Sequence, residues 1–259
     1  MKKNIYSLVI ILLSLSIISC SSDDDSATTD AKTIKKIEEK IYYNGQIDTQ
    51  YFMNFNYNNG VLTSLSDDNY RLEFVYNGDK IIETKRYFNN QFTNSNFLIY
   101  ENNLLKTIIL DDQEEQTNFT YQNGKLNSKS YSFLDNGTMT TYSSETYQFM
   151  SNNIVQTIYQ SQFSTIPWKK TFEFDSKNNM MKNMNPYLKY IIDFETIDIL
   201  SENNPIKSYS YDSVNSTQGI LDREYVITYD ADNYPTVIKK YNLYNNQQQL
   251  ISEMIISYN

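Results

Sequence analysis

Residues 51–65, YFMNFNYNNGVLTSL, contain the pattern that decides the fold of this 259-residue chain. In the first half, Tyr51, Met53, Phe55 and Tyr57 recur at every second position, and this period of two places their side chains on one face of a β-strand. The Asn-Asn-Gly that follows favours the left-handed backbone of a tight turn, and the aliphatic residues beyond it are typical of a returning strand. The stretch therefore predicts a β-hairpin.

The same unit recurs through the chain as an aromatic strand end, an Asn- or Gly-containing turn and an aliphatic run. From Tyr57 onward the copies are spaced by about 25 residues on average, and a period of roughly 20 to 50 residues indicates stacked supersecondary units. The copies begin at Tyr43, Tyr57, Tyr76, Tyr100, Tyr121, Phe149, Phe174, Leu200 and Tyr229, and Tyr258 closes the chain as a half copy.

The turns have their own chemistry. Asn-Gly supplies the two positive φ angles of a two-residue type I′ hairpin turn, and Asn-Asn does a similar job because asparagine tolerates the left-handed region. The Asn-Gly pairs lie at 44–45, 77–78 and 123–124, and the Asn-Asn pairs at 102–103, 152–153, 178–179 and 203–204.

These patterns predict an all-β protein, an antiparallel meander of about nine repeated hairpins. About 18 strands are too many for a flat sheet, so we expect twist to coil them into a wide barrel-like or superhelical sheet closed over its apolar face. Residues 183–200 depart from the pattern and predict a wide loop or a short helix across an end of the sheet. A transmembrane barrel is the competing interpretation, but Asn54, Asn56, Lys129 and Ser130 interrupt the apolar bands that it needs.

The N-terminus predicts a lipid anchor. Lys2 and Lys3 precede an apolar run from Ile5 to Ile18, which is too short to span a bilayer and has the length of a signal-peptide core. The run ends at Ile17-Ile18-Ser19-Cys20, which resembles the lipobox of bacterial lipoproteins. The resemblance implies cleavage before Cys20 and acylation of Cys20, and several acyl chains anchor a protein durably.

The residues after Cys20 predict the cellular location of the protein. Ser21, Ser22, Asp23, Asp24 and Asp25 resemble the surface-export signal of Bacteroidota-type lipoproteins, although a solvated acidic linker has the same composition. We therefore expect a lipid-anchored outer-membrane protein, displayed at the cell surface or facing the periplasm. The expected organisation is a signal peptide (1–19), a lipidated flexible tether (20–33) and a single hairpin-repeat domain (34–259).

Composition excludes several function classes. The formal net charge of −9 disfavours nucleic acid as a partner. The absence of histidine and the single cysteine exclude Cys/His zinc sites, disulfides and imidazole-activated nucleophiles. We therefore expect no catalytic residues, no metal and no cofactor.

Carboxylates are the remaining candidates for acid–base chemistry. Those at 111–115 are expected at a hairpin tip, those at 193–198 lie in the irregular stretch, and neither spacing shows the pair that a glycosidase needs. Asp230-Ala-Asp232-Asn233 offers oxygen ligands for Ca²⁺, but it is better interpreted as a turn held by its own side chains.

Aromatic residues are the candidate ligand contacts. Most of the 24 tyrosines are expected in the core, whereas those on the opposite strand face offer rigid surfaces on which a sugar or peptide stacks. The candidates are Tyr131, Tyr159, Tyr209 and Tyr241, with Tyr42, Tyr142, Tyr211, Tyr244 and Trp168 in the wider set.

The copies, above all Tyr229-Asp-Ala-Asp-Asn-Tyr-Pro, resemble the YD repeats of RHS-type proteins, and residues 40–259 as a whole are similar to Bacteroidota lipoproteins built of such repeats. The resemblance is loose, because most copies lack the Asp after the aromatic residue. It implies a hairpin architecture and no catalytic residues. The expected function is a non-enzymatic binding or scaffold domain for an extracellular glycan or protein. A periplasmic accessory or carrier lipoprotein and a carboxylate-dependent glycan-active enzyme are the alternatives.

Overall fold

The computed structural model describes residues 32–192, 200–244 and 247–259, and Lys32–Asn259 form one compact unit. The described residues form sixteen strands and one short 3₁₀ helix, η1 (Leu188–Tyr190). No helix among them has both the length and the apolar character that a membrane crossing requires. The strands are β1 (Ile34–Tyr43), β2 (Gln46–Asn58), β3 (Val61–Ser66), β4 (Tyr70–Asn77), β5 (Lys80–Phe88), β6 (Gln91–Glu101), β7 (Leu104–Leu110), β8 (Glu115–Gln122), β9 (Lys125–Asp135), β10 (Thr138–Met150), β11 (Asn153–Ser161), β12 (Trp168–Phe174), β13 (Pro205–Tyr211), β14 (Ile220–Tyr229), β15 (Pro235–Tyr244) and β16 (Gln247–Tyr258).

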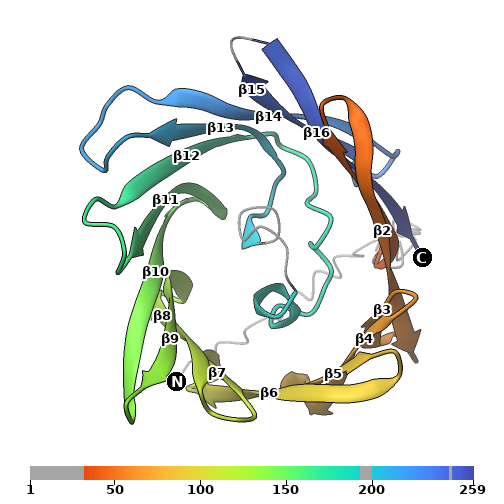
Figure 1. The fold of residues 1–259 in the computed structure, drawn as a ribbon. Helices are drawn as coiled ribbons and strands as arrows, with labels where there is room; N and C mark the ends of the chain where they lie inside the picture. Colours follow the sequence, from red (N-terminus) through yellow and green to blue (C-terminus); the bar gives the residue numbers. More distant parts are fainter. Residues whose placement is uncertain (1–31, 193–199, 245–246) are drawn as a thin grey trace, which may run out of the picture. The chain divides into compact units, whose positions relative to one another are not determined.

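Each strand pairs antiparallel with its neighbours in sequence, and β1 pairs with β16, so the sheet closes into a barrel (Figure 1). The expected all-β antiparallel meander is therefore confirmed, and closure selects the barrel over the superhelical sheet. The first and last strands meet in this closure, where Ile34 lies opposite Tyr258.

The expected count of about nine hairpins is wrong, because two of the nine copies are not separate hairpins of the series. The Tyr43 turn joins β1 to β2 at the opposite end of the barrel from the other repeat turns. Phe174 and Leu200 lie at the two ends of one long connection between β12 and β13. Sixteen strands therefore replace the expected 18 or so.

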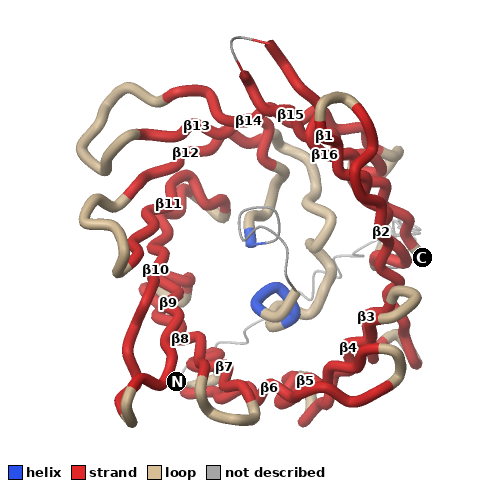
Figure 2. Tube along the Cα trace, viewed as in Figure 1, coloured by secondary structure: helices blue, strands red, loops and turns tan. Residues whose placement is uncertain are grey.

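The long connection, residues 175–204, is named the plug here. Figure 2 shows its described part, residues 175–192 and 200–204, with η1, inside the ring of strands. The plug contacts the barrel end that contains the β2–β3 turn, and this end is called the plugged end. The opposite end, which contains the β1–β2 turn, is called the open end. The expectation of an irregular segment with a short helix across an end of the sheet is confirmed for its described part.

The turn chemistry is confirmed at three of the predicted pairs. Both residues have positive φ in Asn44-Gly45, Asn102-Asn103 and Asn123-Gly124. In the β4–β5 turn only Gly78 has positive φ, because Asn77 still belongs to β4 and the connection is Gly78-Asp79, the pattern of a type II′ turn.

The remaining predicted pairs do not form such turns. In the β10–β11 turn the residue with positive φ is Ser151, since Asn153 already belongs to β11. The pairs at 178–179 and 203–204 belong to the plug, where asparagine side chains bind other segments instead of shaping a two-residue turn.

The repeated tyrosines hold neighbouring hairpins together at the plugged end. Tyr76 donates its hydroxyl hydrogen bond to the backbone oxygen of Leu62, 2.7 Å away, which is the aliphatic residue just after the preceding turn. The same bond recurs with Tyr57 to Ile34, Tyr100 to Ile81, Tyr121 to Leu105 and Tyr258 to Pro235. We call these five residues the tyrosine ring. The regular recurrence of an aromatic residue before each turn thus places a tyrosine hydroxyl where it bonds the backbone of the neighbouring hairpin.

The plug is anchored by packing and by amide groups. Met181 and Leu188 are fully buried, and the rings of Tyr100 and Tyr187 pack edge to face at 4.9 Å. At the second end of the plug, Asn203 and Asn153 exchange two hydrogen bonds, of 2.9 and 3.0 Å. The plug is therefore part of the hydrophobic core.

The two faces of the barrel wall differ in chemistry. Near the plugged end the inward face is aliphatic and aromatic and packs with the plug. The outward face carries ion pairs between side chains on the same or adjacent strands. They include Lys36 with Glu38, Arg71 with Glu73 and Lys239 with Glu253.

Candidate functional site in the barrel lumen

A cavity of about 410 Å³ lies in the lumen between the plug and the open end. Its lining comes from the consecutive strands β5 to β10 and from Tyr190 and Ile191 of the plug. The curvature of the sheet brings these strands around one space, and the plug adds two residues that follow Thr84 by more than 100 positions.

One wall of this cavity carries polar atoms without a partner among the described residues: Thr84 Oγ1, Arg86 Nε and Asn94 Oδ1. The Thr84 side chain is 0 % exposed. A buried polar group without a hydrogen bond costs about 1–3 kcal/mol, so these atoms are suited to bind hydroxyl or amide groups of an occupant.

Aromatic side chains lie farther along the same wall, on β9 to β12, toward the open end. The rings of Tyr131 and Tyr142 lie 6.1 Å apart, and Phe133 lies 5.7 Å from Tyr142. The rings of Tyr159 and Trp168 pack at 4.9 Å. We call these five residues the aromatic arc. Tyr131 and Tyr142 line the cavity itself, so the arc joins it.

The electrostatics of the site follow from its position. Burial, together with the charge of Glu115 and the neighbouring Tyr131 and Tyr159, raises the pKa of the Tyr142 hydroxyl above its ordinary value. This hydroxyl is therefore neutral at physiological pH and is both a hydrogen-bond donor and an acceptor.

The predicted aromatic candidates separate into two groups. Tyr131 and Tyr159 lie on the inward face, not on the face opposite the core as expected. The reason is a β-bulge at the start of each strand: Tyr121 pairs with Leu126 but Thr120 pairs with Ser128, and the extra residue reverses the facing of everything that follows. A matching bulge at the start of β11 turns Tyr159 inward.

Tyr209 and Tyr241 lie on the outward face, as expected. Tyr209 donates a hydrogen bond to Glu173 Oε1 at 2.7 Å on the outer wall, and Tyr241 follows the inward-facing Lys240. They are remote from the cavity, and the side chain of Tyr244 lies outside the described part. Of the wider set, Tyr142 and Trp168 join Tyr131 and Tyr159 in the arc.

Sequence reasoning missed Thr84, Arg86 and Asn94. No local signal marks them, because each is an ordinary polar residue of a strand in which polar residues usually face water. Only the pairing of Arg86 with Asn94, and the position of both in the cavity that Tyr131 and Tyr142 also line, gives them a role.

The carboxylate candidates form no metal cluster among the described residues. Asp111, Asp112 and Glu114 lie exposed in the β7–β8 connection at the open end, and Glu115 begins β8. The candidates at 193–198 lie outside the described residues.

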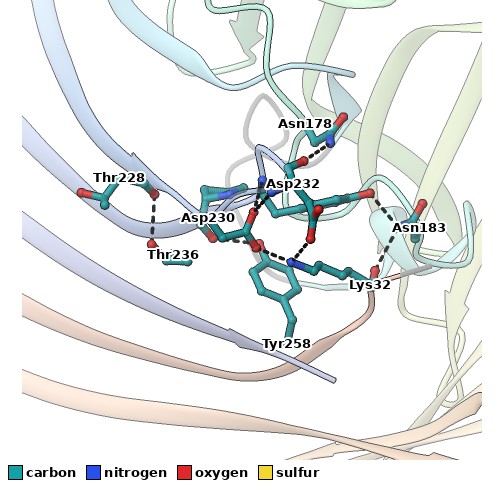
Figure 3. Close-up of polar contacts among 10 residues, drawn as sticks. Lys32, Asn178, Asn183, Thr228, Asp230, Asp232, Thr236 and Tyr258 are labelled. Atoms are coloured by element: carbon teal, nitrogen blue, oxygen red, sulfur yellow. Dashed lines mark hydrogen bonds and ion pairs between the residues drawn. The ribbon is translucent and has the colours of Figure 1, made fainter. Parts of the chain in front are cut away.

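Asp230 and its neighbours form a turn held by side chains (Figure 3). Asp230 Oδ1 accepts hydrogen bonds from the backbone N–H groups of Asp232 and Tyr234, both at 2.9 Å. Lys32 pairs with Asp230 and Asp232 at 2.6 and 2.5 Å, and its backbone oxygen accepts a bond from Asn183 of the plug. The interpretation as a turn is therefore confirmed, and the cation beside it is a lysine of this chain.

The lipidation site Cys20 and the predicted export signal, Ser21 to Asp25, lie outside the described residues. Lys32 shows where the described chain begins: at the plugged end, beside the β14–β15 turn.

No known family model matches the sequence, and no curated protein matches it. A solved structure described as that of a porin-like protein from Bacteroides uniformis ATCC 8492 is similar, with a TM-score of 0.49 and 14% identity, and the match covers 87% of this chain and 97% of that chain. A likeness at this level shows neither a shared activity nor a shared location.

Proposed function

We propose that this protein is a non-enzymatic, outer-membrane-anchored lipoprotein that binds a short extracellular glycan in the lumen of its barrel. The observation that carries the proposal is one cavity lined both by the buried polar side chains of Thr84, Arg86 and Asn94 and by Tyr131 and Tyr142 of the aromatic arc. Sugars present hydroxyl groups at their edges and apolar C–H faces, so they require both kinds of wall.

The plug supports binding rather than passage. It supplies the cavity floor through Tyr190 and Ile191, and Tyr190 packs edge to face on Phe119 at 5.2 Å. A ligand that enters through the open end therefore meets a packed floor, and the terminal one or two sugar units occupy a cavity of about 410 Å³.

Anchoring is proposed to depend on the lipid at Cys20, and the YD-type repeat is proposed to serve only as the barrel's building unit. Ion pairs such as Lys239 with Glu253, 3.0 Å apart on the outward face, disfavour a wall immersed in lipid, where a basic residue costs about 2–4 kcal/mol at the midplane. Surface display follows from the export signal at Ser21 to Asp25.

Binding is tested with the full-length protein in detergent against a panel of oligosaccharides, followed by calorimetry on those that bind. Tyr131→Ala is expected to weaken binding roughly tenfold to a hundredfold, because a large stacking surface is lost. Tyr209→Ala removes an equally predicted tyrosine from the outward face and is expected to leave the affinity unchanged.

Thr84→Val separates binding from folding. It is expected to weaken binding about fivefold while leaving stability equal or higher, because it replaces an unpartnered buried hydroxyl by a methyl group of the same shape. If Tyr131→Ala and Thr84→Val bind like the wild type, the ligand does not occupy the lumen and the proposal is wrong.

Three further measurements test the lipid anchor, the surface display and the absence of catalysis. Cys20→Ser is expected to release the protein from membranes, and persistent membrane association would contradict the lipid anchor. Protease treatment of intact cells distinguishes surface display from the periplasmic alternative, in which the protein is cleaved only after the outer membrane is broken. Cleavage of a bound glycan, abolished by Glu115→Gln, would favour the enzyme instead.

A further inference from the structure

The open end is acidic without any basic counterpart in its connections. The chain segments that join strands there contain six carboxylates and neither lysine nor arginine. These are Asp67, Asp68, Asp111, Asp112, Glu114 and Asp212. Glu115, which follows directly, lines the cavity.

The plugged end is mixed in charge. There Lys32 neutralises Asp230 and Asp232 through two ion pairs, and the plug contributes Lys177, Lys182 and Lys189 to the same end. At the open end a basic group also approaches the connections, since Lys169 at the start of β12 donates to the backbone oxygens of Val214 and Ser216. The six carboxylates still outnumber it, so the acidic excess of the open end is a local feature.

The six carboxylates lie in three of the open-end connections, β3–β4, β7–β8 and β13–β14. An excess of one charge at the mouth of a low-dielectric cleft focuses the field into that cleft and raises the local concentration of ions of the opposite sign. The cleft here contains the fully buried Thr84 hydroxyl without a partner among the described residues, which independently indicates an occupant. The carboxylates and the cavity are thus parts of one entrance.

We infer that the lumen takes a cationic saccharide, an oligosaccharide of amino sugars with free ammonium groups. This inference rests on the proposed function and names its ligand class. The terminal sugar lies between Thr84 and the aromatic arc, where Arg86 donates to hydroxyl oxygens. The following units extend through the mouth, where their ammonium groups lie among the carboxylates. An anionic saccharide is repelled on the same path.

Some of these carboxylates also accept hydrogen bonds that stabilise turns. The substitutions that test the inference are therefore made at other carboxylates. Asp67 Oδ1 accepts bonds from the backbone of Asn69 and Tyr70, and Asp112 Oδ1 from that of Glu114. Asp68 and the side chain of Glu114 have no such hydrogen bond among the described residues, and both are exposed. Asp68→Asn/Glu114→Gln therefore changes the charge of the mouth and leaves its turns intact.

The probes are tetramers of β-1,4-linked glucosamine and of N-acetylglucosamine, which share one backbone and differ in charge, together with an anionic galacturonate tetramer. Calorimetry uses the full-length protein at mildly acidic pH, where the free amines are protonated. The glucosamine tetramer is expected to bind about tenfold more tightly than the acetylated one at low salt, with the difference shrinking as salt screens the mouth. Galacturonate is expected to bind most weakly.

The control variant Asp79→Asn/Glu101→Gln makes the same two chemical changes at exposed positions of the plugged end. Asp68→Asn/Glu114→Gln is expected to reduce the preference for the amine severalfold, and the control variant to preserve it. An equal loss in both variants would show a field of the whole protein and overturn the assignment to the mouth.

The remaining outcomes separate this inference from the proposed function. Equal affinity for the two tetramers overturns the charge selection and leaves glycan binding standing. Glucosamine binding that persists unchanged in Thr84→Val and Tyr131→Ala places the ligand outside the lumen and overturns the inference. No binding of any saccharide, charged or neutral, overturns the proposed function itself.

Discussion

The two ends of the barrel are built from the same hairpins and differ in nearly every other respect. At the plugged end the turns are short, the tyrosine ring ties each hairpin to the one before, and the plug fills the lumen with buried residues such as Leu188. At the open end the β3–β4, β7–β8, β11–β12 and β13–β14 connections are longer than two residues, and three of these four carry carboxylates. Large apolar side chains face water there, with Phe163 86 % and Ile220 65 % exposed.

The difference between the two ends shows that the same hairpins have two roles. At the plugged end they stabilise the barrel, and at the open end they surround the cavity. The strand ends beside the turn after the repeat aromatic residue are built for stability, because tyrosine hydroxyls bond neighbouring hairpins there and the plug packs on the inward face. The turn at the other end of the same strands has no such constraint, and it is the one that surrounds the cavity. Loops that carry function are expected where a rigid scaffold frees them from packing.

The strongest test of this contrast is Leu188→Ala. Leu188 is fully buried at the centre of the plug, so its truncation removes apolar contacts and leaves a cavity, at a cost of about 2–5 kcal/mol in the free energy of unfolding. Ile220→Ala at the open end is the matched truncation and is expected to change stability by less than about 0.5 kcal/mol. Urea unfolding of both variants measures the difference, and similar losses would show that the two ends are equally structural.

Alkaline pH is expected to destabilise the plugged end, because the tyrosine ring ionises there. Burial raises the pKa of Tyr57 to about 12, and burial also raises the pKa values of Tyr76, Tyr100, Tyr121 and Tyr258 above the ordinary value of 10. A group whose pKa is raised in the folded state contributes stability that is complete below its unfolded pKa and is lost above it. We therefore expect the urea midpoint to be constant up to about pH 9 and to fall steeply above pH 10.

Tyrosinate absorbance measured in parallel gives the matching readout. It is expected to rise together with unfolding at high pH. Ionisation of all tyrosines near their ordinary pKa, with the fold intact, would contradict the buried tyrosine ring.

A single bond of the ring is tested by Tyr121→Phe. The variant removes the hydrogen bond of 2.9 Å to the Leu105 backbone oxygen and is expected to cost about 1 kcal/mol. Tyr43→Phe, in the β1–β2 hairpin of the open end with Tyr43 71 % exposed, is the control and is expected to cost nothing measurable. Equal midpoints for both variants in urea would show that the ring bonds contribute no net stability.

The smallest effect is expected at the tip of the β11–β12 connection. Phe163→Ser is expected to leave the free energy of unfolding within about 0.5 kcal/mol of the wild type, since the side chain is almost fully exposed. A clear loss of stability in thermal unfolding would mean that the open-end connections are packed and would weaken the contrast between the two ends.

The sequence by itself determined the local structure. Alternation of apolar residues and the Asn and Gly turns operate over a few residues, so the hairpins, the antiparallel pairing and turns such as Asn123-Gly124 were predictable. The departure at 183–200 was also visible, because Pro186 and the longer apolar run break the local pattern.

Only the tertiary structure decided the rest. Closure of β1 on β16, the merging of the Phe174 and Leu200 copies into one plug, and the cavity between Thr84 and Tyr131 all depend on contacts between distant residues. A single bulge residue reverses the facing of a strand, and no local pattern marks it reliably. For that reason the sequence identified Tyr131 and Tyr159 as candidates, while the barrel alone decided that they face the lumen and that Tyr209 and Tyr241 do not.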